Sequence, residues 1–263
     1  LKDYGNLDTR LVALRARAPE DSTECDEWVD RITTLPGVER IEAADGTVSL
    51  RVNGLEFARQ SRQELFFGLE TKHLARASNL SEIEALAREL IRVRSSDAAD
   101  RQHRLYSKFP ERWLESQVRR SLSEIDAGLL PKPVYGQVPA FAGGDRSVID
   151  LLAADGSGRL AVIEIKASED VHLPLQALDY WMRVKWHVDR DEFSMNGYFP
   201  GRALTRRAPR LMLVAPSLSF HSTTETVVGY LSPLVPVERI GLGMDWQSGL
   251  KVVFRAQGAD SPD

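Results

Sequence analysis

The segment Val148–Lys166, VIDLLAADGSGRLAVIEIK, determines how the rest of the chain is interpreted, because it places charged side chains within two apolar runs. Asp150 lies in the first run, and Glu164 and Lys166 end the second. An ionised side chain in a buried strand costs roughly several kcal/mol unless it is paired or bound to a metal. The three charges therefore mark either a solvated sheet edge or a functional site.

The glycine-rich turn between the two runs predicts a hairpin and its register. If Gly156–Gly158 form a three-residue loop, Asp155 and Arg159 close it. Counting outward from this pair places Asp150 opposite Glu164, with Cβ atoms about 5 Å apart. The turn sequence also permits other loop lengths, so the apolar pattern has to decide between registers.

A shift of one residue would put Asp150 opposite Ile163 and mix an acid with the core. The apolar pattern therefore favours the first register. In that register Asp150, Glu164 and Lys166 share one face of the hairpin, since side chains alternate between the two faces of a strand.

Two carboxylates on one face are typical of a metal site. They repel each other unless a cation lies between them, and hard oxygen ligands select Mg²⁺ or Mn²⁺. Lys166 points to the same side, where it can orient or deprotonate a water molecule and favour a developing phosphorane. The face therefore suits metal-assisted hydrolysis of a phosphodiester.

These residues resemble a known family. Asp150 followed by Glu164–Lys166 on a hairpin resembles the D…(D/E)xK motif of the PD-(D/E)xK nuclease superfamily. Glu115 lies in an expected helix before the hairpin, where many members carry a glutamate near the metal. Gln176 and Tyr180 form the QxxxY pattern of RecB-like and NucS-like members, one helical turn apart.

The resemblance covers residues 100–260 and implies a restriction-endonuclease-like αβββαβ core. The chain departs from the superfamily's name at Ile149, where the name has proline. By this likeness, Lys166 serves catalysis, and Gln176 and Tyr180 support the site or the DNA strand. The implied Mg²⁺ ligands, with Mn²⁺ as the alternative ion, are Asp150, Glu164, the Ile165 carbonyl and Glu115.

Arginines before the "LMLVAP" run allow two interpretations. Arg202, Arg206, Arg207 and Arg210 form either a solvated loop or an arm that contacts phosphates beside the cleft. The second would make binding sensitive to salt. Arg119, on the expected Glu115 helix, is a further candidate for nucleic-acid contact.

Residues 1–78 predict a small α+β unit. The stretch 22–35 has helical spacing, and Pro36-Gly37 ends it. Alternating runs at residues 38–43, 47–52 and 55–60, with an Asn-Gly turn, predict a three-stranded meander. The stretch 65–77 is ambiguous between strand and loop.

Residues 79–99 predict a helical connector, opened by a capping box of Ser81 and Glu84. Residues 100–263 form the nuclease-like domain, and the order of elements there predicts a mixed sheet flanked by helices, an α/β class. Besides the hairpin, we expect helices at 102–125 (interrupted near Pro110), 172–188 and 222–232, and strands at 209–216, 235–241 and 250–255.

Composition excludes some classes of protein. The 263 residues carry a net charge of −4, so no global basic field indicates a protein that coats nucleic acid. The single cysteine, Cys25, excludes internal disulfides and cysteine-rich zinc sites and fits a reducing cytoplasm. Apolar runs fall short of the roughly 20 residues of a membrane span. We therefore expect a cytoplasmic location.

We predict a metal-dependent deoxyribonuclease, with RNA left open as a substrate and repair or defence as the setting. Cutting both strands of a duplex would favour a two-fold homodimer. One alternative is an inactive nuclease-fold module that binds nucleic acid or a protein partner. Another is an unrelated α/β scaffold whose hairpin charges lie at a solvated edge.

Overall fold

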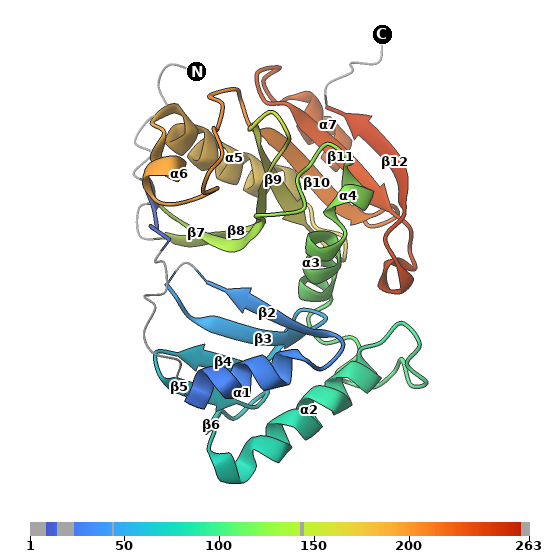
Figure 1. Ribbon diagram of the computed structural model, residues 1–263. Coiled ribbons are helices and arrows are strands. Elements are labelled where there is room, and N and C mark those ends of the chain that lie inside the picture. Colours follow the sequence, from blue (N-terminus) through green and yellow to red (C-terminus); the bar gives the residue numbers. More distant parts are fainter. Residues whose placement is uncertain (1–8, 15–23, 44, 143–144, 259–263) are drawn as a thin grey trace. The chain divides into compact units, whose positions relative to one another are not determined.

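The computed structural model describes residues 9–14, 24–43, 45–142 and 145–258 (Figure 1). The chain forms two compact units. We call residues 14–116 the N-terminal unit, and residues 1–13 together with 117–263 the large unit. The boundary between them falls within helix α3 (Pro110–Arg120).

The N-terminal unit contains an antiparallel five-stranded sheet in the order β2-β3-β4-β5-β6. Helix α2, which covers most of the expected connector, packs against α1, β3 and β4 within this unit. The elements are α1 (Glu24–Thr33), β2 (Val38–Glu42), β3 (Val48–Val52), β4 (Leu55–Ser61), β5 (Glu64–Phe67), β6 (His73–Leu74), the 3₁₀ turn η1 (Ala77–Asn79) and α2 (Leu80–Val93).

The predicted meander of three strands is wrong in strand number, because β5 and β6 extend it. Leu65 and Phe67 are buried, whereas Glu64 is exposed and Phe66 is partly exposed, so the alternation of a half-buried strand continues past β4. Ser61 pairs with Glu64 across the tight connection between β4 and β5. The ambiguous stretch 65–77 is therefore partly strand.

The predicted capping box at the start of α2 is also wrong. The helix begins at Leu80, so Ser81 already lies inside its first turn. Glu84 is buried and forms ion pairs with Arg31 at 2.6 Å and Arg88 at 3.0 Å. Since Arg31 belongs to α1, Glu84 links the two helices and does not cap α2.

The helix expected over residues 102–125 begins only at Pro110, and residues 102–109 are not helical. Proline lacks a backbone N–H and disfavours helical geometry in the residue before it, so it suits a first helical position. Phe109 has a φ of 52°, which no right-handed helix allows. A short helix, α4 (Leu122–Ile125), follows α3.

The large unit contains a mixed seven-stranded sheet in the order β1-β7-β8-β9-β10-β11-β12, in which β9, β10 and β11 are parallel. Its strands are β1 (Thr9–Leu11), β7 (Tyr135–Ala142), β8 (Asp145–Ala154), β9 (Leu160–Ile165), β10 (Arg210–Pro216), β11 (Val237–Leu242) and β12 (Val252–Gln257). Strands β1 and β7 had no counterpart in the sequence pattern. The α/β class is confirmed.

Helix α5 (Leu173–Asp189) packs against β9 and β10 and carries proline in its first turn, as expected. The remaining helices of this unit are α6 (Glu192–Met195), α7 (Thr224–Gly229) and the 3₁₀ turn η2 (Trp246–Ser248). Among the described residues, no helix is long and apolar enough to cross a membrane.

The predicted register of the β8–β9 hairpin is confirmed. Leu151 pairs with Ile163 and Ala154 pairs with Leu160. The N–H of Asp155 donates to the carbonyl of Arg159 at 2.9 Å and closes the three-residue loop. Both strands lie inside the sheet, and all of β9 is buried. These strands therefore do not form a solvated sheet edge, which is what the alternative of an unrelated α/β scaffold assumed.

Candidate active site

The carboxylate of Asp150 is held at the end of β9. Extending the observed register by one pair places Asp150 across from Glu164. Its Oδ2 accepts a hydrogen bond from the backbone N–H of Ile165 at 2.9 Å. A carboxylate fixed by a backbone donor has a defined orientation, so Asp150 is positioned before any ligand arrives.

Glu164 and Lys166 lie on one face of β9, as the alternation of a strand requires. The Lys166 Nζ lies 3.8 Å from Glu164 Oε1 and 3.6 Å from Asp170 Oδ2. Glu164 is almost fully buried, with 1% of its side chain exposed, whereas Lys166 keeps 12% exposed. The backbone N–H of Lys166 donates to the Val214 carbonyl of β10 at 3.0 Å and fixes the strand end.

Gln176 and Tyr180 on α5 face the same group. The Gln176 amide donates to the Tyr180 hydroxyl at 3.0 Å. Burial raises the pKa of the Tyr180 phenol, and the negative charges of Glu164 and Asp150 raise that pKa further, against the lowering effect of the Gln176 hydrogen bond. Both acids therefore lie near one phenol, on the α5 side of the sheet.

The structure brings together five of the predicted site residues and adds one that the sequence did not single out. Asp150 and Glu164 both lie near the Tyr180 phenol, and their carboxylate oxygens suit a hard divalent ion. No group of three or more His, Cys, Asp or Glu side chains in metal-binding proximity occurs among the described residues.

Asp170 follows Lys166 by four residues, in the bend before α5. Its Oδ1 accepts a hydrogen bond from the His172 N–H at 2.8 Å, which orients its other oxygen toward Lys166. The only signal in the sequence was an acid shortly after the motif. Such a residue reaches the site only through the bend, which spacing does not predict.

Glu115 is buried on the part of α3 that belongs to the N-terminal unit. The acids of the hairpin belong to the large unit. The role of Glu115 as a metal ligand stays a prediction. Arg119, half-buried in the last turn of α3, likewise stays a candidate for phosphate contact.

The arginine loop before β10 lies at the far end of β9 from this group. Because β9 and β10 are parallel, the residues before β10 lie beside the start of β9, and Lys166 follows its end. Arg202 donates to the Lys132 carbonyl, Arg206 pairs with Asp191, and Arg207 lines a cavity. The structure therefore does not place this loop beside Lys166.

Comparisons of the chain with models of known protein families, with curated proteins and with solved structures find no match.

Proposed function

We propose that the large unit is a metal-dependent nuclease that hydrolyses phosphodiester bonds of DNA. The observation that carries the proposal is the convergence of Asp150, Glu164 and Lys166 at the end of one buried strand, with Lys166 Nζ 3.8 Å from Glu164. Burial of ions is costly, and clusters of buried ionisable groups are typical of functional sites.

The order of elements supports the same proposal. From α3 onward, the chain runs through helix, β7, β8, β9, α5 and β10, with the acids on β8 and β9 and the QxxxY pair on α5 (Figure 1). This order is that of the αβββαβ core that the resemblance implies. A restriction-endonuclease-like core is accordingly part of the proposal.

The residues present fit a divalent metal ion. Asp150, Glu164 and the carbonyl of Ile165 would hold Mg²⁺, with Mn²⁺ as a substitute. The ion would supply a Lewis acid that polarises the scissile phosphate and lowers the pKa of a water molecule. Carboxylate and carbonyl oxygens favour hard cations over softer ones.

The side chains of this site have separate roles. Lys166 orients the attacking water, and its charge offsets the negative charge that develops on the phosphorane. Asp170, whose Oδ2 lies 3.6 Å from Lys166 Nζ, helps to position Lys166. Tyr180 presents a hydroxyl beside the acids, and that hydroxyl accepts a hydrogen bond from Gln176.

The test is cleavage of end-labelled single-stranded and double-stranded DNA with Mg²⁺, Mn²⁺ or EDTA. The full chain is compared with Lys166→Ala and with Lys251→Ala, which removes the same charge at an exposed residue. We expect cleavage with either metal, none with EDTA, a loss of at least about 100-fold in Lys166→Ala, and little change in Lys251→Ala.

No cleavage of any labelled DNA by the folded chain with either metal would overturn the proposal, and a binding module would then replace it. Equal loss in both lysine variants would also contradict the role of Lys166. Parallel measurements with labelled RNA determine whether the substrate class is wider than DNA.

A further inference from the structure

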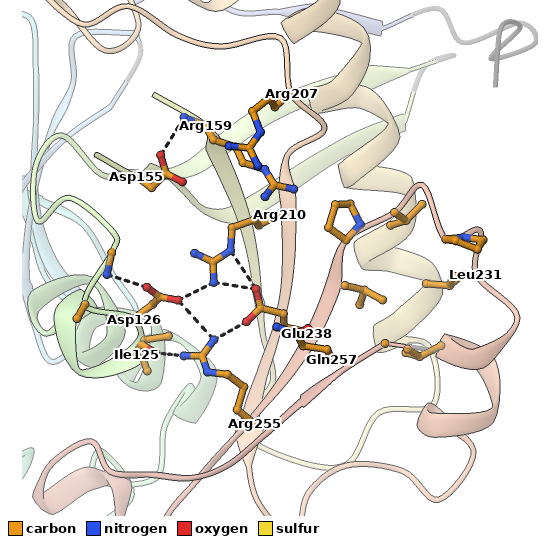
Figure 2. A pocket seen from close by; sticks show the side chains of 18 of the residues that line it. Ile125, Asp126, Asp155, Arg159, Arg207, Arg210, Leu231, Glu238, Arg255 and Gln257 are labelled. Atoms are coloured by element: carbon orange, nitrogen blue, oxygen red, sulfur yellow. Dashed lines mark hydrogen bonds and ion pairs between the residues drawn. The ribbon is translucent and has the colours of Figure 1, made fainter. Parts of the chain in front are cut away.

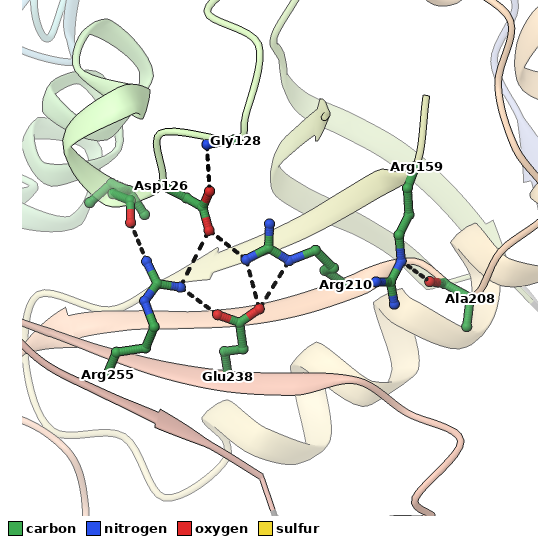
Figure 3. A network of polar contacts seen from close by, with 8 residues as sticks. Asp126, Gly128, Arg159, Ala208, Arg210, Glu238 and Arg255 are labelled. Carbon is green, nitrogen blue, oxygen red and sulfur yellow. Dashed lines mark hydrogen bonds and ion pairs between the residues drawn. The ribbon is translucent and has the colours of Figure 1, made fainter. Parts of the chain in front are cut away.

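The two faces of the large unit's sheet carry different chemistry, and strand β12 shows the division. On one face lies a cavity of about 980 Å³ (Figure 2). Arg255 of β12 points to this cavity and pairs there with Asp126 and Glu238 (Figure 3). The described lining of the cavity carries four arginines and four carboxylates, so its charges balance. This face therefore holds a network of ion pairs that joins strands and helix ends.

Phe254 points to the other face of β12, because it precedes Arg255 and side chains alternate along a strand. Gly241 of β11 lies opposite Phe254 in the register. The Phe254 ring covers this glycine, since a Cβ added at Gly241 would lie 2.1 Å from the ring atom Cε1. The aromatic ring therefore lies over β11 and not beyond the edge of the sheet.

The face that carries Phe254 is also the face of the candidate active site. Ala215 of β10 pairs with Gly241, and continuing the β9–β10 register by one residue places Lys166 beside Ala215. Residues paired across neighbouring strands point to the same face of a sheet. Lys166, Ala215, Gly241 and Phe254 therefore form one row across the sheet. At the usual strand spacing, Gly241 and the ring above it lie about 10 Å from Lys166.

Phe220 forms an aromatic pair with Phe254. The centres of the two rings lie 5.6 Å apart, and their planes are inclined by 54°. Phe220 belongs to the connection 217–223 between β10 and α7. Both rings are partly exposed, and Leu218 in the same connection is 80% exposed. The pair therefore presents apolar ring surface to the solvent.

The connection that carries Phe220 also reaches the bend of the candidate active site. His221 Nε2 lies 4.0 Å from Glu169 Oε1, and Glu169 directly precedes Asp170. The aromatic pair thus adjoins the acids and Lys166 through the sheet row and through this connection. Exposed apolar surface beside polar catalytic groups is typical of a site whose ligand has an apolar part.

We propose that Phe220 and Phe254 form a stacking platform for an unpaired nucleobase next to the phosphodiester at Lys166. The inference rests on the proposed nuclease, since that function places the scissile phosphate there. Bases are the flat apolar part of such a substrate, and they stack on aromatic side chains with little regard to sequence. A base inside a duplex reaches a protein ring only by leaving the stack, at a cost in free energy. The site therefore prefers single-stranded DNA to an intact duplex.

Calorimetric titration of the full chain with an unlabelled oligothymidylate tests the platform. The chain carries Lys166→Ala to prevent cleavage, and the buffer contains Mg²⁺ to offset the charge of the acids. The same titration is made with a fully abasic strand and with a blunt duplex of equal length. We expect affinity at least about tenfold weaker for each of these two than for the oligothymidylate.

Variants of the two rings locate the base. In Phe220→Ala and in Phe254→Leu, the ratio of the affinities for the oligothymidylate and the abasic strand should fall at least about fivefold. Leucine keeps an apolar side chain over Gly241, so the second variant preserves the packing of β12. Tyr230→Ala removes an aromatic side chain that is 87% exposed in the same unit, and it should leave the ratio unchanged.

Equal affinity for the oligothymidylate and the abasic strand, a ratio unchanged in Phe220→Ala, or tighter binding of the duplex would overturn the platform. If the native chain still cleaves DNA in that case, the nuclease proposal stands without it. Affinity that depends on the bases and on Phe220, in a native chain that cleaves no DNA, would support the platform as part of a binding module. The two proposals are therefore judged by separate measurements.

Discussion

Lys166 lies between two carboxylates, at 3.8 Å from Glu164 and 3.6 Å from Asp170. Both carboxylates attract the ammonium at the end of β9. Sequence spacing predicted that Asp150, Glu164 and Lys166 share a face, because the apolar pattern of the two strands favoured one register. It could not predict Asp170, whose contact depends on the bend after the strand.

At the residue scale, we predict that Glu164→Gln weakens binding of Mn²⁺ by more than about tenfold, because an amide oxygen replaces a buried charged ligand. Calorimetric titration with Mn²⁺ measures the affinity. Glu169→Gln is the matched control, since it removes the same charge from a more exposed neighbour whose side chain is 60% exposed. Equal affinity in the native chain and Glu164→Gln would exclude Glu164 as a ligand.

The β8–β9 hairpin shows at the scale of elements what the sequence could and could not predict. The glycines permitted several loop lengths, and the apolar pattern of the two strands selected the register that the structure shows. No local pattern in the sequence predicts that the segment around Ala203 and Thr205 contacts the turn at Gly158. The N–H of Thr205 donates to the Gly158 carbonyl at 2.9 Å, and this contact joins the arginine loop to the hairpin.

Gly158→Ala should destabilise the large unit by about 2 kcal/mol or more. Gly158 has a φ of 80°, and an added Cβ would lie 2.1 Å from the Ala203 carbonyl oxygen. Urea denaturation measures the change in the free energy of unfolding. Gly156→Ala, in the same turn, has open space around its Cβ and serves as the control. Similar effects of the two variants would contradict the close approach at Gly158.

Arg94 organises the segment that precedes α3, although its position after a regular helix gave no sign of this role. It is fully buried and donates to the carbonyls of Asn53, Leu105 and Lys108 at 2.6–2.9 Å. Its guanidinium also lies 4.7 Å from the centre of the Trp113 ring. The chain from residue 102 to 109 is thus held by side-chain donors where a helix was expected.

Arg94→Met should lower the free energy of unfolding of the N-terminal unit by about 3 kcal/mol, because several buried carbonyls lose their donor. Limited proteolysis should then cut within residues 95–109 faster than in the native chain. Arg92→Met, two residues earlier in the last turn of α2 and 71% exposed, should leave both measurements nearly unchanged. An unchanged rate of cleavage within residues 95–109 in Arg94→Met would contradict this role of Arg94.

For the whole molecule, the large unit depends on contacts between segments far apart in the chain. Strand β1 pairs with β7, and the Tyr198 hydroxyl donates to the Val12 carbonyl at 2.9 Å. Such short strands and distant pairings carry no periodic signal in the sequence. The alternating and apolar runs predicted the central strands, whereas β1 and β7 emerge only from the assembled sheet.

Tyr198 links the stability of this unit to alkaline pH. Burial raises the pKa of its phenol to about 12, from an ordinary value of 10.0, and the neighbouring Tyr135 contributes. The unfolded chain therefore ionises first, so stability that is complete below pH 10 should be lost between pH 10 and 12, by about 2–3 kcal/mol. Tyr198→Phe should reduce this loss, measured by urea denaturation at pH 9 and pH 11.5.

The control for this prediction is Tyr230→Phe, because Tyr230 is 87% exposed. That variant should show the same decline with pH as the native chain. A decline that is identical in Tyr198→Phe would assign the alkaline sensitivity to other groups.

The rate of DNA cleavage as a function of Mg²⁺ concentration, measured for the native chain and for Asp150→Asn, tests the proposed metal-dependent nuclease most directly. We predict a native rate that rises with Mg²⁺, saturates, and disappears in EDTA, and a rate at least about 100-fold lower in Asp150→Asn. Cleavage that persists in EDTA, or that is equally fast in Asp150→Asn, would contradict it.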